Sequence, residues 1–319
     1  MRLLPAIIAS ALLLIAGCAG RQTVITPANE TRSVDLPVVD LDLSIPQLSS
    51  CTDNPDHTLH LKPNQPVTVL VHGCFGSSGE FRGLAQVLAF HGQQTICFSY
   101  DDRAGLTESA KELRRALDLV AVQSQASLVT VMGHSQGALI AHKSLTDLKQ
   151  LPPRRETEFR LVTISGPFGG IAAANTCGKR WLYPLTLGLL PLSCYVVTGA
   201  KWTDITNSSP FIRNPGTLIP EVSSFLKIDT DESGSCRREK AARCVDTDDV
   251  FSLPEQRNSA IETDTRARRV QVIAGHVEIV GDKRIAPKKL ISILQEQGVI
   301  LPTAPDQLSA FNRLLAHIY

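Results

Sequence analysis

The chain has 319 residues, of which 43% are hydrophobic and 20% are charged, and its formal net charge is +1. This length supports one large domain with a sizeable core, and it is short for two full domains. Nucleic acid is not an expected partner, because phosphate binding needs clustered Lys and Arg, and the sequence has no strongly basic stripe.

The first residues have the character of a secretory signal. Arg2 precedes a nearly unbroken apolar stretch over residues 3–16, which is shorter than the roughly 20 residues of a membrane-spanning helix. The stretch ends in Ile-Ala-Gly-Cys at residues 15–18, which resembles a bacterial lipobox. That resemblance implies cleavage before Cys18 and lipidation of its thiol. Residues 1–17 are therefore expected to be a lipoprotein signal peptide; the alternative is an ordinary secretory signal with an incidental cysteine.

A lipidated Cys18 would anchor the protein to a membrane, because several acyl chains bury many methylene groups. Ala19 and Gly20 follow it, and no Asp is present there to indicate inner-membrane retention. The outer membrane of a bacterial envelope is therefore the favoured location. Residues 18–60 begin with a stretch rich in Thr, Pro, Asp and Ser, typical of a tether, with one short strand expected at residues 34–43. The folded domain is expected over residues 61–319, as a monomer.

Eight cysteines indicate an oxidising compartment. With Cys18 lipidated, seven remain, so at least one thiol is expected to be free or paired between chains. Cys236 and Cys244 bracket a short polar loop and form the first predicted disulfide. Cys177 and Cys194 form the second, and the pairing of the remaining cysteines stays open, because sequence does not determine connectivity.

Segments typical of strands and helices alternate from residue 67 onwards. Val67–Val71 is a β-branched run of the kind found in buried strands. The other main strands are predicted at residues 94–100, 127–132, 159–164, 225–228 and 269–273. Helices are predicted to begin near Ser77, Thr107, Gly137 and Pro287. This alternation predicts an α/β fold with a mostly parallel central sheet and helices on both faces.

One stretch interrupts the alternation. Residues 165–224 have no clear period but include apolar runs between Cys177 and Cys194. Long irregular insertions in compact domains are usually functional or mobile. We interpret this stretch as a cap-like insertion over an acyl-binding pocket; the alternative is a packed subdomain with no role in ligand binding.

The motif G-x-S-x-G occurs at residues 133–137, with Ser135 at its centre. It follows the strand predicted at residues 127–132 and begins a helical pattern. This strand–turn–helix context is what a nucleophile elbow requires. The helix N-terminus also places backbone N–H groups and a partial positive charge beside the serine. Ser135 is therefore the predicted nucleophile.

A second motif, His-Gly-Cys-Phe-Gly at residues 72–76, directly follows the first predicted strand. A strand, a His-Gly turn, and G-x-S-x-G about sixty residues later resemble the α/β-hydrolases, most closely their bacterial lipase and esterase members. The resemblance implies an oxyanion hole formed by the backbone N–H groups of Cys74 and Gln136. It also implies a structural role for His72, although the residues alone leave His72 open as a general base.

The serine needs a base, and the order Ser, acid, His of this family places that base late in the chain. His276 follows the strand predicted at residues 269–273, where the resemblance places the catalytic histidine. His142, on the helix after the serine, and His317, near the C-terminus, are the other histidines beyond Ser135. His276 is the predicted base, and His317 is expected to be incidental.

The acid of the triad lies among several candidates after the strand at residues 225–228, namely Asp229, Asp231, Asp246, Asp248 and Asp249. In similar enzymes the acid precedes small apolar residues and stands about two dozen residues before the histidine, a pattern that Asp249 fits best. Asp231 is the rival, and Asp248 is the third choice. The choice of Asp249 requires the loop between Cys236 and Cys244 to be an insertion between strand and acid.

These residues predict a lipase- or esterase-like serine hydrolase that cleaves carboxylic esters through an acyl-enzyme. Ser135 attacks the carbonyl, His276 moves the proton, and Asp249 orients the imidazole. The anchor and the apolar insertion favour an acyl-ester or lipid substrate. Two alternatives remain: a catalytically inert binding module at the envelope, and an acyltransferase.

No cofactor and no metal are expected. The sequence has neither a dinucleotide fingerprint nor a phosphate-binding loop. Cys51, Asp53, Asp56, His57 and His60 lie close together in sequence, but their spacing matches no tight zinc site.

Overall fold

The computed structural model describes residues 41–146, 157–177, 186 and 189–319. The chain divides into two units, Met1–Asp35 and Leu36–Tyr319, and all described residues belong to the second. Cys18, the predicted signal peptide and the tether up to residue 40 therefore lie outside the described residues.

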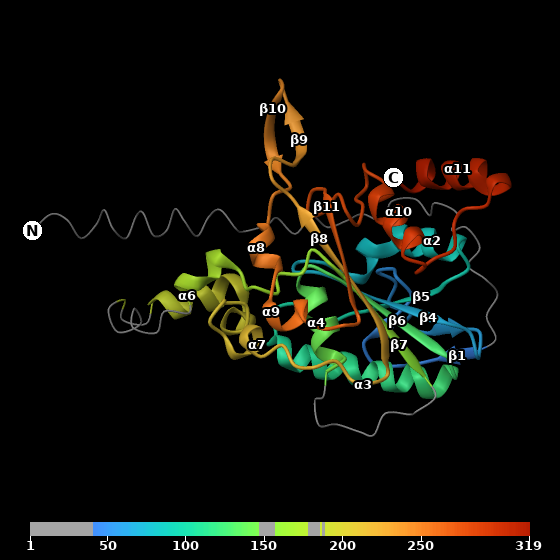
Figure 1. Ribbon diagram of the computed structural model, residues 1–319, viewed down its shortest axis with the longest axis horizontal. Helices are drawn as coiled ribbons and strands as arrows, with labels where there is room; N and C mark the ends of the chain where they lie inside the picture. The colour runs from blue at the N-terminus through green and yellow to red at the C-terminus, as the bar shows by residue number, and fades with distance from the viewer. Residues whose placement is uncertain (1–40, 147–156, 178–185, 187–188) are drawn as a thin grey trace, which may run out of the picture. The chain divides into compact units, whose positions relative to one another are not determined.

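A seven-stranded sheet forms the centre of the second unit (Figure 1). Its strand order is β11-β8-β7-β6-β4-β5-β2. The strands are β2 (Leu48–Ser49), β4 (Val67–Val71), β5 (Gln94–Phe98), β6 (Leu128–His134), β7 (Glu158–Ile164), β8 (Val222–Asp231) and β11 (Ala267–Ile273). Each neighbouring pair is parallel except β2 and β5, which are antiparallel. The predicted mostly parallel sheet is confirmed.

Helices cover both faces of this sheet, and each face has its own apolar core. On one face, α3 (Leu106–Ser124) and α4 (Gln136–Ser144) pack against residues such as Val69 and Val131. On the other, α2 (Arg82–Phe90), α10 (Lys288–Glu296) and α11 (Leu308–Ile318) pack around Leu70 and Met132. The central strands are apolar on both sides for this reason.

A long segment joins β7 to β8 and contains α6 (Leu189–Thr198), the short 3-10 helix η3 (Ala200–Thr203) and α7 (Pro210–Arg213). A disulfide between Cys177 and Cys194 joins α6 to the first part of this segment. The segment corresponds to the insertion expected over residues 165–224, except that β8 begins at Val222.

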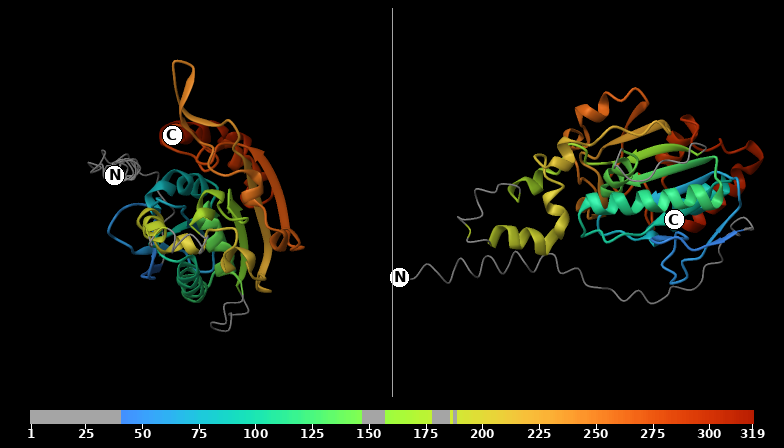
Figure 2. Two further views of the ribbon diagram at one scale, coloured as in Figure 1. Left: turned by 90° about the vertical axis from the view of Figure 1, so that its left-hand side faces the viewer. Right: turned by 90° about the horizontal axis from the view of Figure 1, so that it is seen from below.

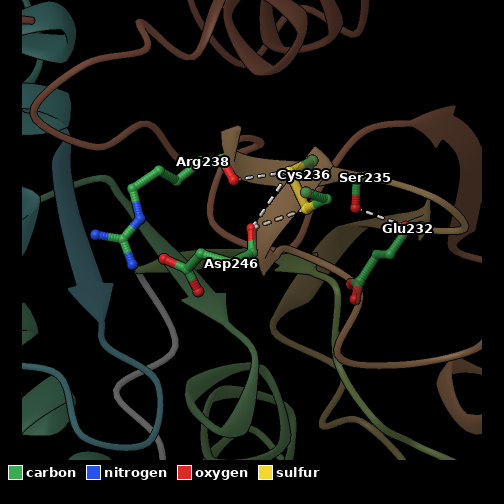
Figure 3. Close-up of a disulfide and its surroundings, with 6 residues drawn as sticks. Glu232, Ser235, Cys236, Arg238 and Asp246 are labelled. Carbon is green, nitrogen blue, oxygen red and sulfur yellow. Dashed lines mark hydrogen bonds between the residues drawn. A yellow bond between two sulfur atoms is a disulfide. The ribbon is translucent and has the colours of Figure 1, made fainter. Parts of the chain in front are cut away.

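Residues 236–244 were expected to form a polar loop, but they belong to a hairpin of β9 (Cys236–Lys240) and β10 (Arg243–Thr247). This hairpin projects away from the sheet (Figures 1 and 2). The predicted disulfide between Cys236 and Cys244 closes it (Figure 3). The short β8 strand predicted at residues 225–228 is extended at both ends.

The structure contains two further disulfides and one free cysteine within the described residues. The predicted Cys177–Cys194 bond is confirmed, and a third bond joins Cys51 to Cys97. Cys74 is the one free cysteine within the described residues.

The remaining elements are short. An antiparallel pair joins β1 (Leu41–Leu43) and β3 (Leu59–Leu61), and α8 (Leu253–Gln256) and α9 (Ser259–Glu262) lie between the hairpin and β11. Of the short strand expected at residues 34–43, only β1 falls within the described residues. No helix in the described part of the chain is long and apolar enough to cross a membrane.

Candidate active site

Ser135 occupies the sharp turn between β6 and α4. Its backbone has φ 56° and ψ −125°, a combination that side-chain-bearing residues adopt only under strain of about 1–3 kcal/mol. Its N–H donates to the carbonyl of Ile164 at 2.9 Å, which fixes the turn against β7. The G-x-S-x-G motif therefore forms the strand–turn–helix geometry that the sequence predicted.

The two glycines of this motif are required by packing. A Cβ on Gly133 would lie 2.3 Å from the carbonyl oxygen of Gly137. A Cβ on Gly137 would lie 2.2 Å from the carbonyl oxygen of Val71. Both distances are shorter than real Cβ contacts, so each position accepts only glycine without a backbone shift.

The His-Gly loop after β4 lies directly beside Ser135. A Cβ on Gly73 would be 3.0 Å from the Cβ of Ser135, so Cys74, the next residue, lies near the nucleophile. His72 is buried and stacks on Tyr100 with ring centroids 4.4 Å apart. Burial lowers the pKa of His72, and its Nδ1 lies 2.9 Å from the carbonyl oxygen of Gly73. These contacts give His72 a structural role within the loop.

His276 lies in the loop after β11 and is 6% exposed. Its Nδ1 is 2.8 Å from Oε1 of Glu232. Its own N–H donates to the carbonyl of Asp248 at 2.9 Å, and its carbonyl oxygen accepts from Nε2 of His134 at 2.9 Å. The ring also meets Phe251 edge-on, with centroids 4.9 Å apart. The imidazole is therefore fixed on its Nδ1 side by a carboxylate.

Glu232 is a fully buried carboxylate at the end of β8, with a side-chain exposure of 0%. Oε1 accepts from Oγ1 of Thr230 at 2.8 Å. Oε2 accepts from the backbone N–H groups of Val250 at 2.7 Å and Phe251 at 2.8 Å. A buried carboxylate needs this many donors to offset its lost hydration. Glu232 and His276 follow the neighbouring parallel strands β8 and β11, whose ends thus bring the two side chains together.

The prediction that Asp249 orients the imidazole is corrected by this geometry. Asp249 is exposed, and Glu232 occupies the position at Nδ1 of His276. The physical reason is that the chain approaches Glu232 through the backbone N–H groups of Val250 and Phe251, while the side chain of Asp249 is exposed to solvent. Sequence reasoning missed the contact of Glu232 with His276, because the strand was expected to end at residue 228 and not at Asp231. The signal that could have found it is that Glu as well as Asp serves as the acid beside a histidine in such triads.

The rival carboxylates have other partners. Asp231 accepts from both N–H and Oγ of Ser233, and these hydrogen bonds lower its pKa. Asp248 is buried and accepts from the N–H groups of Val277 and Glu278 at 2.9–3.1 Å. Asp248 therefore shapes the loop that carries His276 without contacting its ring nitrogens.

The residue before Ser135 in the chain, His134, contacts His276. The rings of His134 and His276 lie 4.7 Å apart, and burial lowers the pKa of His134 well below its ordinary value. Within the described ranges, no hydrogen bond joins Oγ of Ser135 to Nε2 of His276. Such catalytic hydrogen bonds are often long before substrate binds.

The predicted oxyanion residues flank Ser135. Gln136 begins α4, so its backbone N–H is at the helix N-terminus. Cys74 follows Gly73 in the loop beside Ser135, and burial raises the pKa of its thiol although Lys201 acts in the opposite direction. A neutral thiol is a weak nucleophile.

A separate pocket of about 350 Å³ is lined in part by His72 and Gly76 of the His-Gly loop. Its lining is rich in hydroxyl groups, including those of Ser77, Ser78 and Ser99, and contains neither Ser135 nor His276. The cysteine of the cluster at residues 51–60 is bonded to Cys97. No group of three or more potential metal ligands occurs among the residues that the structure describes.

No protein-family model and no curated protein matches this sequence. Solved structures do match it. The mature lipase BlEst2 of Bacillus licheniformis aligns with a TM-score of 0.52 and 14% identity, over 78% of this chain and 96% of that one. The esterase Pf2001 of Pyrococcus furiosus gives 0.41 and 16%, over 73% and 80%. Esterase B of Lactobacillus Rhamnosis gives 0.45 and 12%, over 86% and 89%.

Identities this low establish the architecture alone. The mature lipase aligns over most of both chains with a TM-score above 0.5, so the two proteins share a fold. The chain has the α/β-hydrolase fold that the sequence predicted.

Proposed function

We propose that this protein is a serine esterase of the lipase and esterase type, with Ser135 as nucleophile, His276 as general base and Glu232 as the acid. The observation that carries the proposal is the 2.8 Å contact between Nδ1 of His276 and the buried carboxylate of Glu232, in the segments that follow β11 and β8. Packing of the core does not require a strained serine turn, a histidine and a buried acid close to one another. Structural neighbours that are named lipases and esterases support the same reading.

In the proposed reaction, Oγ of Ser135 attacks an ester carbonyl while Nε2 of His276 takes its proton. Glu232 holds the imidazole in the tautomer with the proton on Nδ1 and stabilises the imidazolium that forms. The alcohol leaves with the proton from His276, and water then hydrolyses the acyl-enzyme by the same route. Backbone N–H groups of Cys74 and Gln136 stabilise the oxyanion of each tetrahedral intermediate.

We propose acyl esters with an apolar chain, including lipids, as the substrate class. The segment between β7 and β8 supports this, because α6 exposes Leu189, Leu192 and Tyr195 by 55–66%. Exposed apolar side chains grouped on one element are a feature of ligand or membrane contacts. We further propose that the mature protein is a monomer and that lipid on Cys18 holds it at the outer membrane.

Hydrolysis of p-nitrophenyl esters with two-, four-, eight- and twelve-carbon chains tests the proposal. The wild-type protein is expected to turn over at least one ester longer than two carbons, and Ser135→Ala is expected to lose about 10³-fold or more of that activity. Turnover limited to the two-carbon ester would refute the substrate class. Equal turnover by Ser135→Ala would refute the nucleophile. Adding an alcohol acceptor and measuring the ester formed separates hydrolysis from acyl transfer.

A further inference from the structure

A buried lysine from the insertion meets the loop that carries the oxyanion residues. Lys201 lies in η3 and is only 2% exposed. Its Nζ donates to the carbonyl oxygen of Asp102 at 2.6 Å and lies 2.8 Å from Sγ of Cys74. It is also 3.5 Å from Oδ2 of Asp102. The mechanism above uses neither Lys201 nor Asp102, yet burying an ammonium group is costly without such partners.

Asp102 contacts both sides of the oxyanion hole at once. Its Oδ2 accepts the N–H of Phe75 at 2.7 Å, and Phe75 directly follows Cys74. Its carbonyl oxygen accepts from Nε2 of Gln136 at 3.1 Å. The side chain of Gln136 and the backbone after Cys74 are therefore bound to the same residue, and Lys201 joins that residue to the Cys74 thiol.

The loop needs an external restraint because its backbone is strained. Phe75 has φ 58°, in the left-handed region that favours glycine, and its side chain is 75% exposed. Packing of the side chain therefore does little to hold this conformation. The hydrogen bond from its N–H to Asp102 and the stacking of Lys201 over its ring, 5.3 Å from the centroid, are the contacts that hold it.

We propose that Asp102 and Lys201 are positioning residues for the oxyanion hole, which hold the Cys74–Phe75 backbone and Gln136 so that two N–H groups converge on the developing charge. The proposal rests on the esterase function proposed above. It also gives the insertion a defined part in the reaction, since Lys201 belongs to the insertion while its partners lie after β4 and β5. Donors aimed at a charge that develops only in the transition state raise kcat with little effect on KM.

The test compares wild type, Asp102→Ala, Asp102→Asn, Lys201→Met and the double variant Asp102→Ala/Lys201→Met in ester hydrolysis. The expected result is a fall in kcat of about 10- to 100-fold with KM within about 3-fold for Asp102→Ala and Lys201→Met. Asp102→Asn keeps an oxygen that can accept the Phe75 N–H, so it is expected to fall between wild type and Asp102→Ala. Far-ultraviolet circular dichroism verifies that each variant is folded.

Each single variant can lose activity merely because it leaves the other buried charge unpaired, and the double variant controls for this effect. It removes both charges together, and residues that act as one unit are not additive. The kcat of the double variant is therefore expected to lie within about 3-fold of the kcat of the less active single variant. Losses that multiply would show that the two residues act separately, against the proposal.

A transition-state analogue separates positioning from general structure. The inhibition constant of an alkyl trifluoromethyl ketone, whose adduct with Ser135 carries an oxyanion, is expected to rise in proportion to the fall in kcat/KM. Arg103→Gln is the matched control for docking of the insertion, because the guanidinium of Arg103 donates to the carbonyls of Tyr195 and Val196 on α6. It is expected to leave kcat and ketone affinity within about 2-fold of wild type.

Three outcomes overturn the proposal. Unchanged kcat in folded Asp102→Ala and Lys201→Met would show that the hole does not depend on them, while the esterase function would stand through Ser135→Ala. An equal fall in kcat in Arg103→Gln would show that the effect comes from loosening of the insertion and not from the oxyanion hole. No turnover by wild type would remove the proposed function and this inference together.

Discussion

At the scale of single residues, the site depends on a carboxylate that local sequence does not distinguish from its neighbours. Five acidic residues lie between the end of β8 and the start of α8, and their spacing in the sequence does not show which of them meets the histidine. Glu232 differs because the backbone N–H groups of Val250 and Phe251 return to its Oε2. That return depends on the intervening hairpin, which spacing rules do not describe.

The first prediction concerns this carboxylate. Glu232→Gln is expected to lower kcat by about 10²- to 10⁴-fold, because an amide does not stabilise the imidazolium and favours the wrong tautomer of His276. Asp249→Asn is the matched control and is expected to stay within about 2-fold of wild type, because that side chain is exposed. Steady-state hydrolysis of a p-nitrophenyl ester measures both. The reverse ranking of the two variants would restore Asp249 as the acid.

The second prediction concerns His142, which is buried in α4 between Phe168 and Phe225. Burial lowers the pKa of His142 from 6.5 to about 3. Between these values the unfolded chain binds a proton that the folded chain does not, so stability falls as pH falls, by about 1.4 kcal/mol per pH unit.

Urea unfolding at pH 7 and pH 4.5 measures this effect. Between pH 7 and pH 4.5, the free energy of unfolding of His142→Leu is expected to fall by about 2–3 kcal/mol less than that of wild type. His317→Gln, an exposed position on α11, is expected to behave as wild type. A wild-type pH dependence that persists in His142→Leu would contradict the assignment to this histidine.

At the scale of elements, the strand–turn–helix unit of β6 and α4 is the part that sequence describes best. The motif supplies its own boundaries, because glycines are needed on both sides of Ser135 and the flanking patterns change period there. The hairpin of β9 and β10 is the part that sequence describes worst. Its residues are mostly polar and exposed, so they lack the alternation by which strands are recognised.

The third prediction concerns this unit. Gly137→Ala is expected to lower the free energy of unfolding by more than about 2 kcal/mol and to abolish ester hydrolysis, because its Cβ would meet the carbonyl oxygens of Val71 and His72 at 2.2 and 2.4 Å. Gly105→Ala is the control, since its Cβ would meet only Oδ2 of Asp204, at 3.5 Å.

Urea unfolding and ester hydrolysis measure both glycine variants. Gly105→Ala is expected to change stability by less than about 1 kcal/mol and to keep activity. A fully active, stable Gly137→Ala protein would show that β4 and α4 are not packed as closely as the structure indicates.

At the scale of the whole molecule, the class of fold could be predicted while the arrangement within it could not. Alternating apolar strands and amphipathic helices require a sheet buried on both faces, which is what the two apolar cores show. The order of the strands in the sheet depends on where each crossover connection places the next strand, and no single segment of sequence determines that position. That order places β8 beside β11, and so decides which acid meets His276.

We expect Ser135 to be an activated nucleophile, with His276 as its base and Glu232 as the acid that orients the imidazole. Labelling of the purified mature protein with a fluorophosphonate probe tests it most directly, beside Ser135→Ala, His276→Ala and Glu232→Gln. Rapid labelling is expected for wild type and none for Ser135→Ala, and labelling is expected to be slower by about 10²-fold or more in His276→Ala and Glu232→Gln. Absence of labelling in well-folded wild-type protein, with and without detergent, would contradict it.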